Sequence, residues 1–277
     1  MKAFLPIHLL IIFLALLTWG ALLNWSGLPN ASWLAHIRNF VAIFLSGYIL
    51  SHILQRVLGF SHLRIEHRII TTFILFLLID PIHPWWVFFG LGIFVELAER
   101  LIRSQAGPIF NPAALTAFVF GYLGYYPGWW GMNFQPNLSL IPGGMSIAML
   151  LTVPLAGYVA YRYKKHHIVF SFLVTFLVAY ILFFKEIPIF FLLEGTMAFF
   201  LLVMVIEPKT SPVIKKEQYI YGAIIGLGMP LVMQTGWFEA TLGTLLLANL
   251  YTARKYILKK LELLMNTFPI QSSDTVR

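Results

Sequence analysis

Residues 205–212 read Val-Ile-Glu-Pro-Lys-Thr-Ser-Pro, and residues 78–84 read Leu-Ile-Asp-Pro-Ile-His-Pro. Both stretches close an apolar run with an acidic residue that is followed directly by proline. Proline cannot donate a backbone hydrogen bond, and it frees a carbonyl that a bilayer tolerates only where the chain lines a cavity or is buried in protein. One such break could simply stop a helix at a membrane surface. Two breaks at the same place in two successive blocks of apolar segments favour an internal repeat.

A second pair of matching positions follows two apolar segments after each break. Asn111 and Pro112 open one apolar segment, and Glu239 opens another. If the segments cross a membrane alternately, Asp80 and Glu207 face opposite sides, and so do Asn111 and Glu239. This arrangement is typical of inverted repeats, in which discontinuous helices meet near the middle of the membrane.

The composition indicates that most of the chain lies in a membrane. Of its 277 residues, 59% are hydrophobic and only 11% are charged, whereas soluble domains are about 25% charged. A helix needs about 20 apolar residues to cross a bilayer, so the chain has room for about ten crossings joined by short loops. We predict an all-α polytopic membrane protein with spans near 4–25, 38–57, 69–80, 85–98, 109–125, 143–161, 168–184, 188–206, 219–235 and 238–256.

The predicted spans divide into two five-helix repeats of opposite orientation. Residues 1–141 hold the first repeat and an outer loop, residues 142–262 hold the second repeat, and residues 263–277 form a cytoplasmic tail. The first apolar run is longer than the apolar part of an ordinary signal peptide and is not followed by a clear cleavage site. We therefore expect an uncleaved first span.

The basic residues orient these spans. With the N-terminus on the cytoplasmic side, seventeen of the 19 Lys and Arg residues lie on the inner side, and only Arg38 and Lys185 lie outside. Cytoplasmic loops are enriched in Lys and Arg, so both termini are predicted to be cytoplasmic. The net charge of +8 is spread over short clusters between apolar runs. This pattern indicates the lipid bilayer as the partner, and not a nucleic acid.

Acidic residues within the spans are candidate pathway residues, because burying a charge in a membrane is costly. Glu194 and Glu239 lie within predicted spans, and Asp80 lies at the end of one. A proton or cation pathway and a simple hydrogen bond between helices are both consistent with them. The chain has no cysteine, which excludes Cys-ligated iron–sulfur centres. The histidine spacing and the absence of nucleotide-binding motifs predict no metal site and no catalytic residue.

Four stretches occur in the order found in one known family. They are Pro84-Trp85-Trp86-Val87, residues 100–115 (RLIRSQAGPIFNPAAL), Glu207-Pro208-Lys209-Thr210-Ser211-Pro212 and Leu246-Leu247-Ala248-Asn249. Over about residues 70–255 the chain resembles the NqrB/RnfD family. Its members are membrane components of the Rnf electron-transport complex and of the sodium-translocating NADH:quinone oxidoreductase.

The resemblance implies a fold similar to that of urea transporters, with ten helices in two inverted repeats. It also implies a multi-pass protein of the bacterial cytoplasmic (inner) membrane that works with redox partner subunits. Such a protein passes electrons through a bound flavin (FMN or riboflavin) or a quinone. By the same resemblance, the cofactor-binding residues would be Asn111, Pro112, Ser146, Thr152, Glu207, Thr210 and Ser211.

Family members attach FMN through a threonine in a Ser-Gly-Ala-Thr motif after the fifth span, and this motif is absent here. The corresponding residues 142–155 read Pro-Gly-Gly-Met-Ser-Ile-Ala-Met-Leu-Leu-Thr-Val-Pro-Leu, in which Ser146 and Thr152 carry the hydroxyl groups. Any flavin is therefore expected to bind noncovalently. The missing motif and the repeat also leave a second function open, a channel or carrier for a small solute or ion without a redox role.

Overall fold

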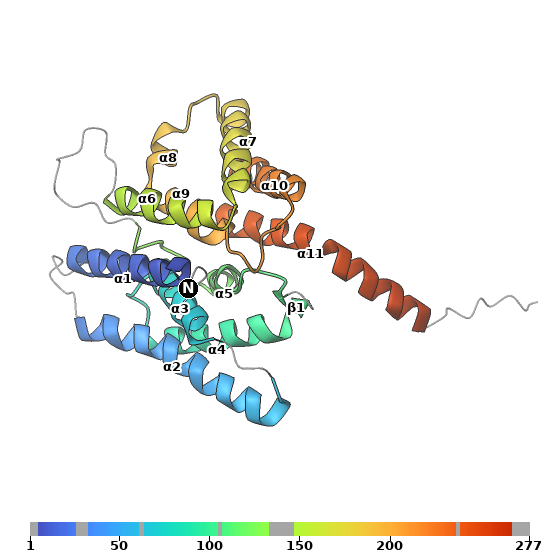
Figure 1. Ribbon diagram of the computed structural model, residues 1–277. Helices are drawn as coiled ribbons and strands as arrows, with labels where there is room; N and C mark the ends of the chain where they lie inside the picture. The colour runs from blue at the N-terminus through green and yellow to red at the C-terminus, as the bar shows by residue number, and fades with distance from the viewer. Residues whose placement is uncertain are drawn as a thin grey trace, which may run out of the picture.

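The computed structural model describes residues 5–25, 33–60, 64–104, 107–132, 147–236 and 239–267 (Figure 1). These residues form helices and loops, with one short antiparallel ribbon of β1 (Arg103–Ser104) and β2 (Gly107–Pro108). The predicted all-α class is confirmed. The helices are α1 (Leu5–Trp25), α2 (Trp33–Leu58), α3 (Ile65–Leu78), α4 (Trp85–Leu101), α5 (Pro112–Tyr122), α6 (Ile147–Arg162), α7 (His166–Phe184), α8 (Ile189–Leu193), α9 (Gly195–Phe199), the π-helix η1 (Phe200–Val205), α10 (Lys215–Gln234) and α11 (Ala240–Thr267).

The helices of the two halves pair in the same order. In the first half α2 packs along α4, α1 packs against α3, and α4 contacts α5. In the second half α7 packs along α10, α6 packs against α9, and α10 contacts α11. Figure 1 shows α2 and α4 at the bottom and α7 and α10 at the top, with α5 and α11 between them. Each half therefore presents the same set of helix pairs.

Glycines let the two long pairs approach closely. A Cβ atom on Gly92 of α4 would lie 2.2 Å from the carbonyl oxygen of Ile43 in α2. A Cβ atom on Gly222 of α10 would lie 2.5 Å from the carbonyl oxygen of Ile168 in α7. Both distances are too short for a side chain, so the backbones touch directly, as small residues allow in membrane helices. The α2–α4 and α7–α10 interfaces are thus of the same kind.

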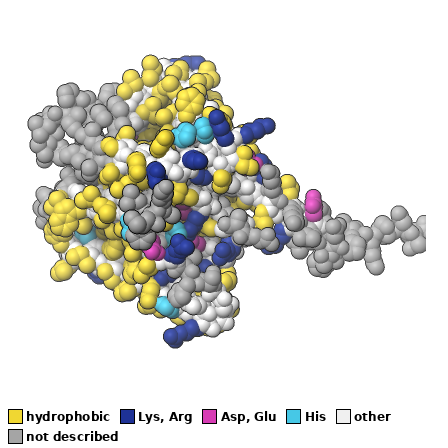
Figure 2. All heavy atoms as spheres, in the orientation of Figure 1, with side chains coloured by type: hydrophobic (Ala, Val, Ile, Leu, Met, Phe, Trp, Pro, Cys, Tyr) yellow, Lys and Arg dark blue, Asp and Glu magenta, His cyan; other side chains and the backbone are white. Residues whose placement is uncertain are grey.

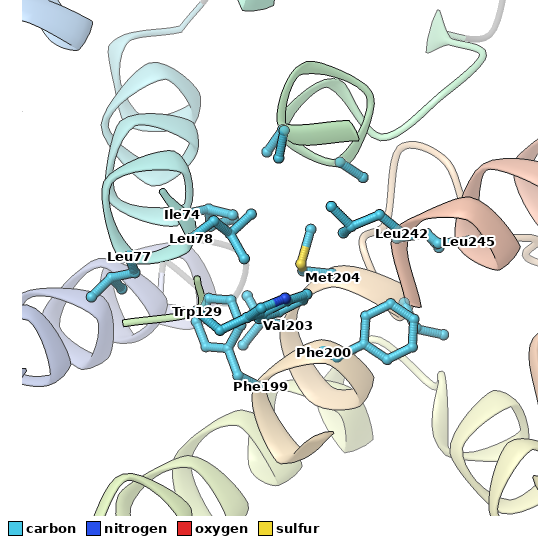
Figure 3. Packing of buried hydrophobic residues seen from close by; sticks show 14 of the residues in the cluster. Ile74, Leu77, Leu78, Trp129, Phe199, Phe200, Val203, Met204, Leu242 and Leu245 are labelled. Atoms are coloured by element: carbon cyan, nitrogen blue, oxygen red, sulfur yellow. The ribbon is translucent and has the colours of Figure 1, made fainter. Parts of the chain in front are cut away.

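The core lies between α3 and η1, the two helices that precede the acid-proline stretches. α3 ends at Leu78 and η1 ends at Val205, just before Asp80 and Glu207. Figure 3 shows apolar side chains from α3, from α9 and η1, from the loop that follows α5 and from α11 pointing toward one another. They include Ile74, Leu77, Leu78, Trp129, Phe199, Phe200, Val203, Met204, Leu242 and Leu245.

The outward faces of the long helices are apolar. The outward stripe of α2 includes Leu34, Ile37, Val41, Leu45 and Ile49, which are spaced three or four residues apart and are all exposed. Figure 2 shows large apolar patches over the visible face of the molecule. Patches of this extent mark contact with a membrane or another protein. The buried face of α2 is more polar than its outer face and carries His36, Asn39, Ile43, Ser46, Gly47 and Ser51.

Two of the described helices, Trp33–Leu58 and His166–Phe184, are long and apolar enough to cross a membrane, and the apolar helices Ile7–Leu23, Pro112–Tyr122 and Gly195–Val205 are shorter. α3 has 14 residues and α5 has 11. At 1.5 Å per residue they reach about 21 and 17 Å, which is less than the roughly 30 Å of a bilayer core. The ten membrane crossings therefore stay a prediction. In that prediction the short helices α3 and α5 would each cross only part of the bilayer, as discontinuous helices do.

Several helix boundaries differ from the predicted spans. The predicted span 188–206 is interrupted at Glu194, whose extended backbone separates α8 from α9. α2 begins at Trp33 and not near residue 38, and α11 continues to Thr267, past the predicted tail boundary at residue 262. The Leu- and Lys-rich end of α11 has high helix propensity, which does not depend on a membrane. The predicted boundary at residues 141 and 142 lies outside the described residues.

Candidate functional site

The acid-proline break after η1 is a tight turn built around Glu207. The Thr210 hydroxyl donates a hydrogen bond to Glu207 Oε2 at 3.1 Å. The Ser211 hydroxyl and backbone amide both donate to the Glu207 carbonyl oxygen, at 2.7 and 3.0 Å. Pro208 cannot continue the helix, so these side chains take the place of helical hydrogen bonds. The turn fixes the Glu207 carboxylate at the end of η1.

A buried lysine holds the far side of this turn. Lys165, between α6 and α7, donates from Nζ to the carbonyl oxygens of Ser211 at 3.0 Å and Pro212 at 2.8 Å. The Gln218 amide donates to the carbonyl oxygens of Pro212 and Val213, each at 3.2 Å. Burial lowers the pKa of Lys165 to about 8. Two side chains from other elements thus satisfy carbonyls that the prolines leave free.

Asn111 joins the first half of the chain to this break. It caps α5 by accepting a hydrogen bond from the Ala114 amide at Oδ1, 2.9 Å away. Its side-chain amide donates to the Met204 carbonyl oxygen in η1 at 3.3 Å. Its backbone amide donates to Asn249 Oδ1 at 2.8 Å, and the Asn249 side chain donates to the Tyr221 hydroxyl oxygen at 2.8 Å. The start of α5 therefore lies against the last turn of η1.

A charged pair links the same break to α4. Lys209 Nζ lies 2.6 Å from Glu99 Oε1. His67, at the start of α3, lies near both charges. Burial and the neighbouring charge of Lys209 lower the pKa of His67, which favours its neutral form at physiological pH. Neutral imidazole can donate from one ring nitrogen and accept at the other.

A cavity of about 880 Å³, counted with its opening, adjoins this polar cluster. Apolar side chains of α1, α3, α6 and η1 form most of its wall, among them Leu10, Ile70, Ile74, Val159 and Leu202. Its polar lining includes Glu99, Asn111, Tyr163, Glu207, Lys209 and His67, and Pro112 also lines it. The cavity thus has an apolar wall and one polar side at the acid-proline break.

A second polar cluster lies at the other break. The Trp129 backbone amide donates to the Leu78 carbonyl oxygen at 2.9 Å, and its indole donates to Glu239 Oε1 at 3.4 Å. Asp80 accepts a hydrogen bond from the Ile82 amide at 3.0 Å, which forms the turn after α3. Glu239 is buried and Asp80 is half-buried. Trp129 therefore connects the end of α3 to the start of α11.

The predicted site residues fall into two groups and three outliers. Asn111, Pro112, Glu207, Thr210 and Ser211 come together around the break at Glu207. Glu239 bonds to Trp129, which in turn bonds to Leu78, two residues before Asp80. Glu194 is exposed in the gap between α8 and α9 and joins neither group. Thr152 lies in α6, and Ser146 is outside the described residues.

Several residues around the break at Glu207 were not predicted as site residues. They are His67, Glu99, Tyr163, Lys165, Lys209, Gln218, Tyr221 and Asn249. Asn249 had a signal in the sequence, because a polar amide stands in the apolar run that opens α11. Lys165 had none, because it belongs to a basic loop whose other members are exposed. Its role depends on carbonyl groups about 45 residues away in the sequence.

A buried ion pair network between α2, α3 and α4 was also not predicted. Glu96 accepts hydrogen bonds from Arg100 Nε at 2.5 Å and from Arg68 Nη2 at 3.4 Å. Arg100 also donates to the Ser51 hydroxyl oxygen at 2.6 Å. The i, i+4 spacing of Glu96 and Arg100 is visible in the sequence, but the contribution of Arg68 depends on the fold.

Comparisons with known proteins give one finding about relationship. Residues 127–254 match the model of the NQR2, RnfD, RnfE family. The predicted relationship is confirmed over this segment, which contains Glu207, Glu239 and Asn249. No curated protein matches the chain at a significant level. Within the described residues, no group of three or more His, Asp and Glu side chains is arranged to hold a metal ion.

Proposed function

We propose that this chain, whose residues 127–254 match the model of the NQR2, RnfD, RnfE family, is a membrane-integral subunit of an Rnf- or Nqr-type electron-transport complex. We propose further that the cavity beside Glu207 binds a flavin or a quinone. The observation that carries this proposal is the cavity itself, which places a large apolar wall against one polar break. The subunit would act with redox partner subunits in a bacterial inner membrane.

The lining of the cavity fits an aromatic redox ring. Ligand pockets are lined mostly by apolar side chains with a few placed polar groups. The carbonyl oxygens of a flavin or quinone ring accept hydrogen bonds, and Lys209, Tyr163 and His67 carry donors in the lining. Either group, when bound, supplies the capacity to accept and release electrons. The protein supplies the position of the ring and the hydrogen bonds to its edge.

The charges of the lining favour some cofactors over others. Among the described lining residues, Lys209 is the sole Lys or Arg, and Glu99 pairs with it. Glu207 adds a further carboxylate on the same side. The phosphate of FMN would therefore lack a matching cation here. This lining favours riboflavin or a quinone, bound noncovalently, over FMN.

The contacts between the halves support the proposed inverted repeat. Asn111, at the start of the fifth predicted span, bonds to Met204 beside the break of the second half. Glu239, at the start of the tenth predicted span, bonds to Trp129, which is held by Leu78 beside the break of the first half. Each half thus places the start of its last span at the break of the other half. Two units related by a two-fold axis in the membrane plane would make this reciprocal contact.

The experiment for the proposed function is a spectrum of the purified chain with its partner subunits. A bound flavin is expected to absorb blue light and to be released, with its fluorescence, when the protein is denatured. A bound quinone is expected to be found when the protein is extracted with an organic solvent. A large side chain in the cavity should reduce the bound amount. We expect Ile70→Trp to lose most of the cofactor, because Ile70 lines the cavity.

Ile53→Trp is the matched control, because Ile53 is 50% exposed on the outer face of α2 and a membrane-facing indole leaves the cavity unchanged. Equal cofactor content in the two variants would place the ligand elsewhere. A preparation without flavin, extracted quinone or quinone-dependent activity would contradict the redox role. In that case uptake of a small solute or ion into proteoliposomes would be the remaining function to measure.

A further inference from the structure

A groove runs between the end of α4, the β1–β2 ribbon and the far part of α11. We call it the ribbon groove. It measures about 630 Å³ with its opening. Its described lining contains no acidic residue. The aliphatic side chains that line it are Leu101, Ile102, Ile109 and Ile257, and the cationic ones are Arg103 and Lys260.

The length of α11 places this groove at one surface of the membrane. α11 has 28 residues and is therefore about 42 Å long, which exceeds the roughly 30 Å of a bilayer core. Glu239 precedes its first turn at the opposite end, so the part near Lys260 lies about 30 Å along the helix. Figure 1 shows this part of α11 extending away from the rest of the molecule. The distribution of basic residues assigns this end to the cytoplasmic side.

The exposed groups around the ribbon groove are of two kinds. Leu101 is 61% exposed and Leu258, beside the groove on α11, is 58% exposed. Arg103 and Lys260 are also exposed, and neither is paired with a carboxylate in the part of the chain that the structure describes. By contrast, Lys209 pairs with Glu99. Aliphatic groups beside unpaired cations match an amphiphile that carries negative charge.

We propose that the ribbon groove binds one anionic phospholipid of the cytoplasmic leaflet. Its phosphate would lie between Arg103 and Lys260, and the first part of its acyl chains would lie along Ile102, Ile109 and Ile257. Basic clusters just outside a membrane span attract anionic lipids, and the aliphatic floor adds a site for the chains. The proposal rests on the proposed membrane orientation, and it does not require a redox role.

Native mass spectrometry of the detergent-purified chain tests this proposal with two lipids that differ in head-group charge, phosphatidylglycerol and phosphatidylcholine. We expect one phosphatidylglycerol to bind preferentially. The double variant Arg103→Gln with Lys260→Gln is expected to weaken phosphatidylglycerol binding about 30-fold. Each basic residue near the membrane surface increases the affinity for an anionic lipid by about a factor of five, and two such residues are removed. Binding of phosphatidylcholine should change little.

The matched control is Arg162→Gln with Lys216→Gln. Both residues are basic and exposed on the same predicted side of the membrane, outside the ribbon groove, so this variant should bind phosphatidylglycerol like the wild type. Equal weakening in the two double variants would show non-specific attraction and overturn the proposal. Equal affinity of the wild type for phosphatidylglycerol and phosphatidylcholine would also overturn the proposal. This comparison needs no variant, so it remains valid even if a variant fails to fold.

Two further outcomes separate this site from other ligands. Millimolar inorganic phosphate should not displace phosphatidylglycerol, because it lacks the acyl chains; displacement would assign the groove to free phosphate. In a different outcome, a partner subunit copurifies with the wild type and is lost only from the Arg103→Gln, Lys260→Gln variant, while the wild type shows no preference between the two lipids. That result would assign the ribbon groove to the partner subunit. Flavin or quinone content is measured separately, so a failure of the redox proposal leaves this test unaffected.

Discussion

Glu96→Gln is expected to lower the free energy of unfolding by about 3–5 kcal/mol, because it removes the buried negative charge that pairs with Arg100 and Arg68. Glu96 is 4% exposed, and it bonds to Arg100 at 2.5 Å and to Arg68 at 3.4 Å. Glutamine keeps the shape and one acceptor but removes the negative charge. The network joins α3 to α4, and Arg100 extends it to Ser51 of α2, so its loss affects three helices of the first half.

Glu217→Gln is the control for this prediction. Glu217 pairs with Arg254 at 3.4 Å, and the two side chains are 22% and 34% exposed. A solvent-accessible pair of this kind is worth about 0–1 kcal/mol. Unfolding by SDS in mixed micelles, followed by tryptophan fluorescence, measures both variants. A Glu96→Gln protein as stable as Glu217→Gln would contradict the buried network.

Gly92→Ala is expected to destabilise the chain by about 1–3 kcal/mol or more, because a methyl group has no room at the α2–α4 interface. The added Cβ atom would lie 2.1 Å from Ser46 Oγ and 2.2 Å from the Ile43 carbonyl oxygen. The serine side chain can rotate away, but the Ile43 carbonyl belongs to the backbone of α2. The two helices must therefore move apart, which also disturbs the contact between Arg100 and Ser51.

Gly157→Ala is the matched control, because a Cβ atom on Gly157 in α6 meets nothing within 4 Å. Alanine favours a helix over glycine by about 0.5–1 kcal/mol, so this variant should be unchanged or slightly more stable. The same substitution is thus expected to act in opposite directions at the two positions. Thermal unfolding monitored by size-exclusion chromatography in detergent compares them. Equal midpoints would show that α2 and α4 are not in close contact at Gly92.

The helical class and the central polar residues could be predicted from the sequence, because the signals were local. Apolar runs define the helices, and an acid followed by proline marks each break. Asn111 stood out because it opens an apolar segment together with Pro112, and the structure places it at the start of α5 as the N-cap. Glu207 and Glu239 stood out because a carboxylate is rare in an apolar segment.

Other parts of the site depend on tertiary contacts that no local pattern specifies. Lys165 reaches carbonyl groups in a loop far away in the sequence, and Arg68 pairs with a carboxylate on another helix. Glu194 was predicted as a pathway residue because it interrupts an apolar run. The structure places it in an exposed gap between α8 and α9. An isolated acidic residue in an apolar run has the same local sequence pattern whether it is buried between helices or exposed in a gap. Its burial in the fold distinguishes the two cases.

The central claim is that the two acid-proline breaks lie on opposite sides of the membrane, and cysteine accessibility tests it most directly. The chain has no cysteine, so a single introduced thiol gives an unambiguous signal. Ile82 follows the first break and is 77% exposed, and Val213 follows the second break and is 82% exposed. A membrane-impermeant maleimide applied to right-side-out and inverted vesicles should label Ile82→Cys from the outside only and Val213→Cys from the inside only. Labelling of both positions from the same side would contradict the inverted repeat.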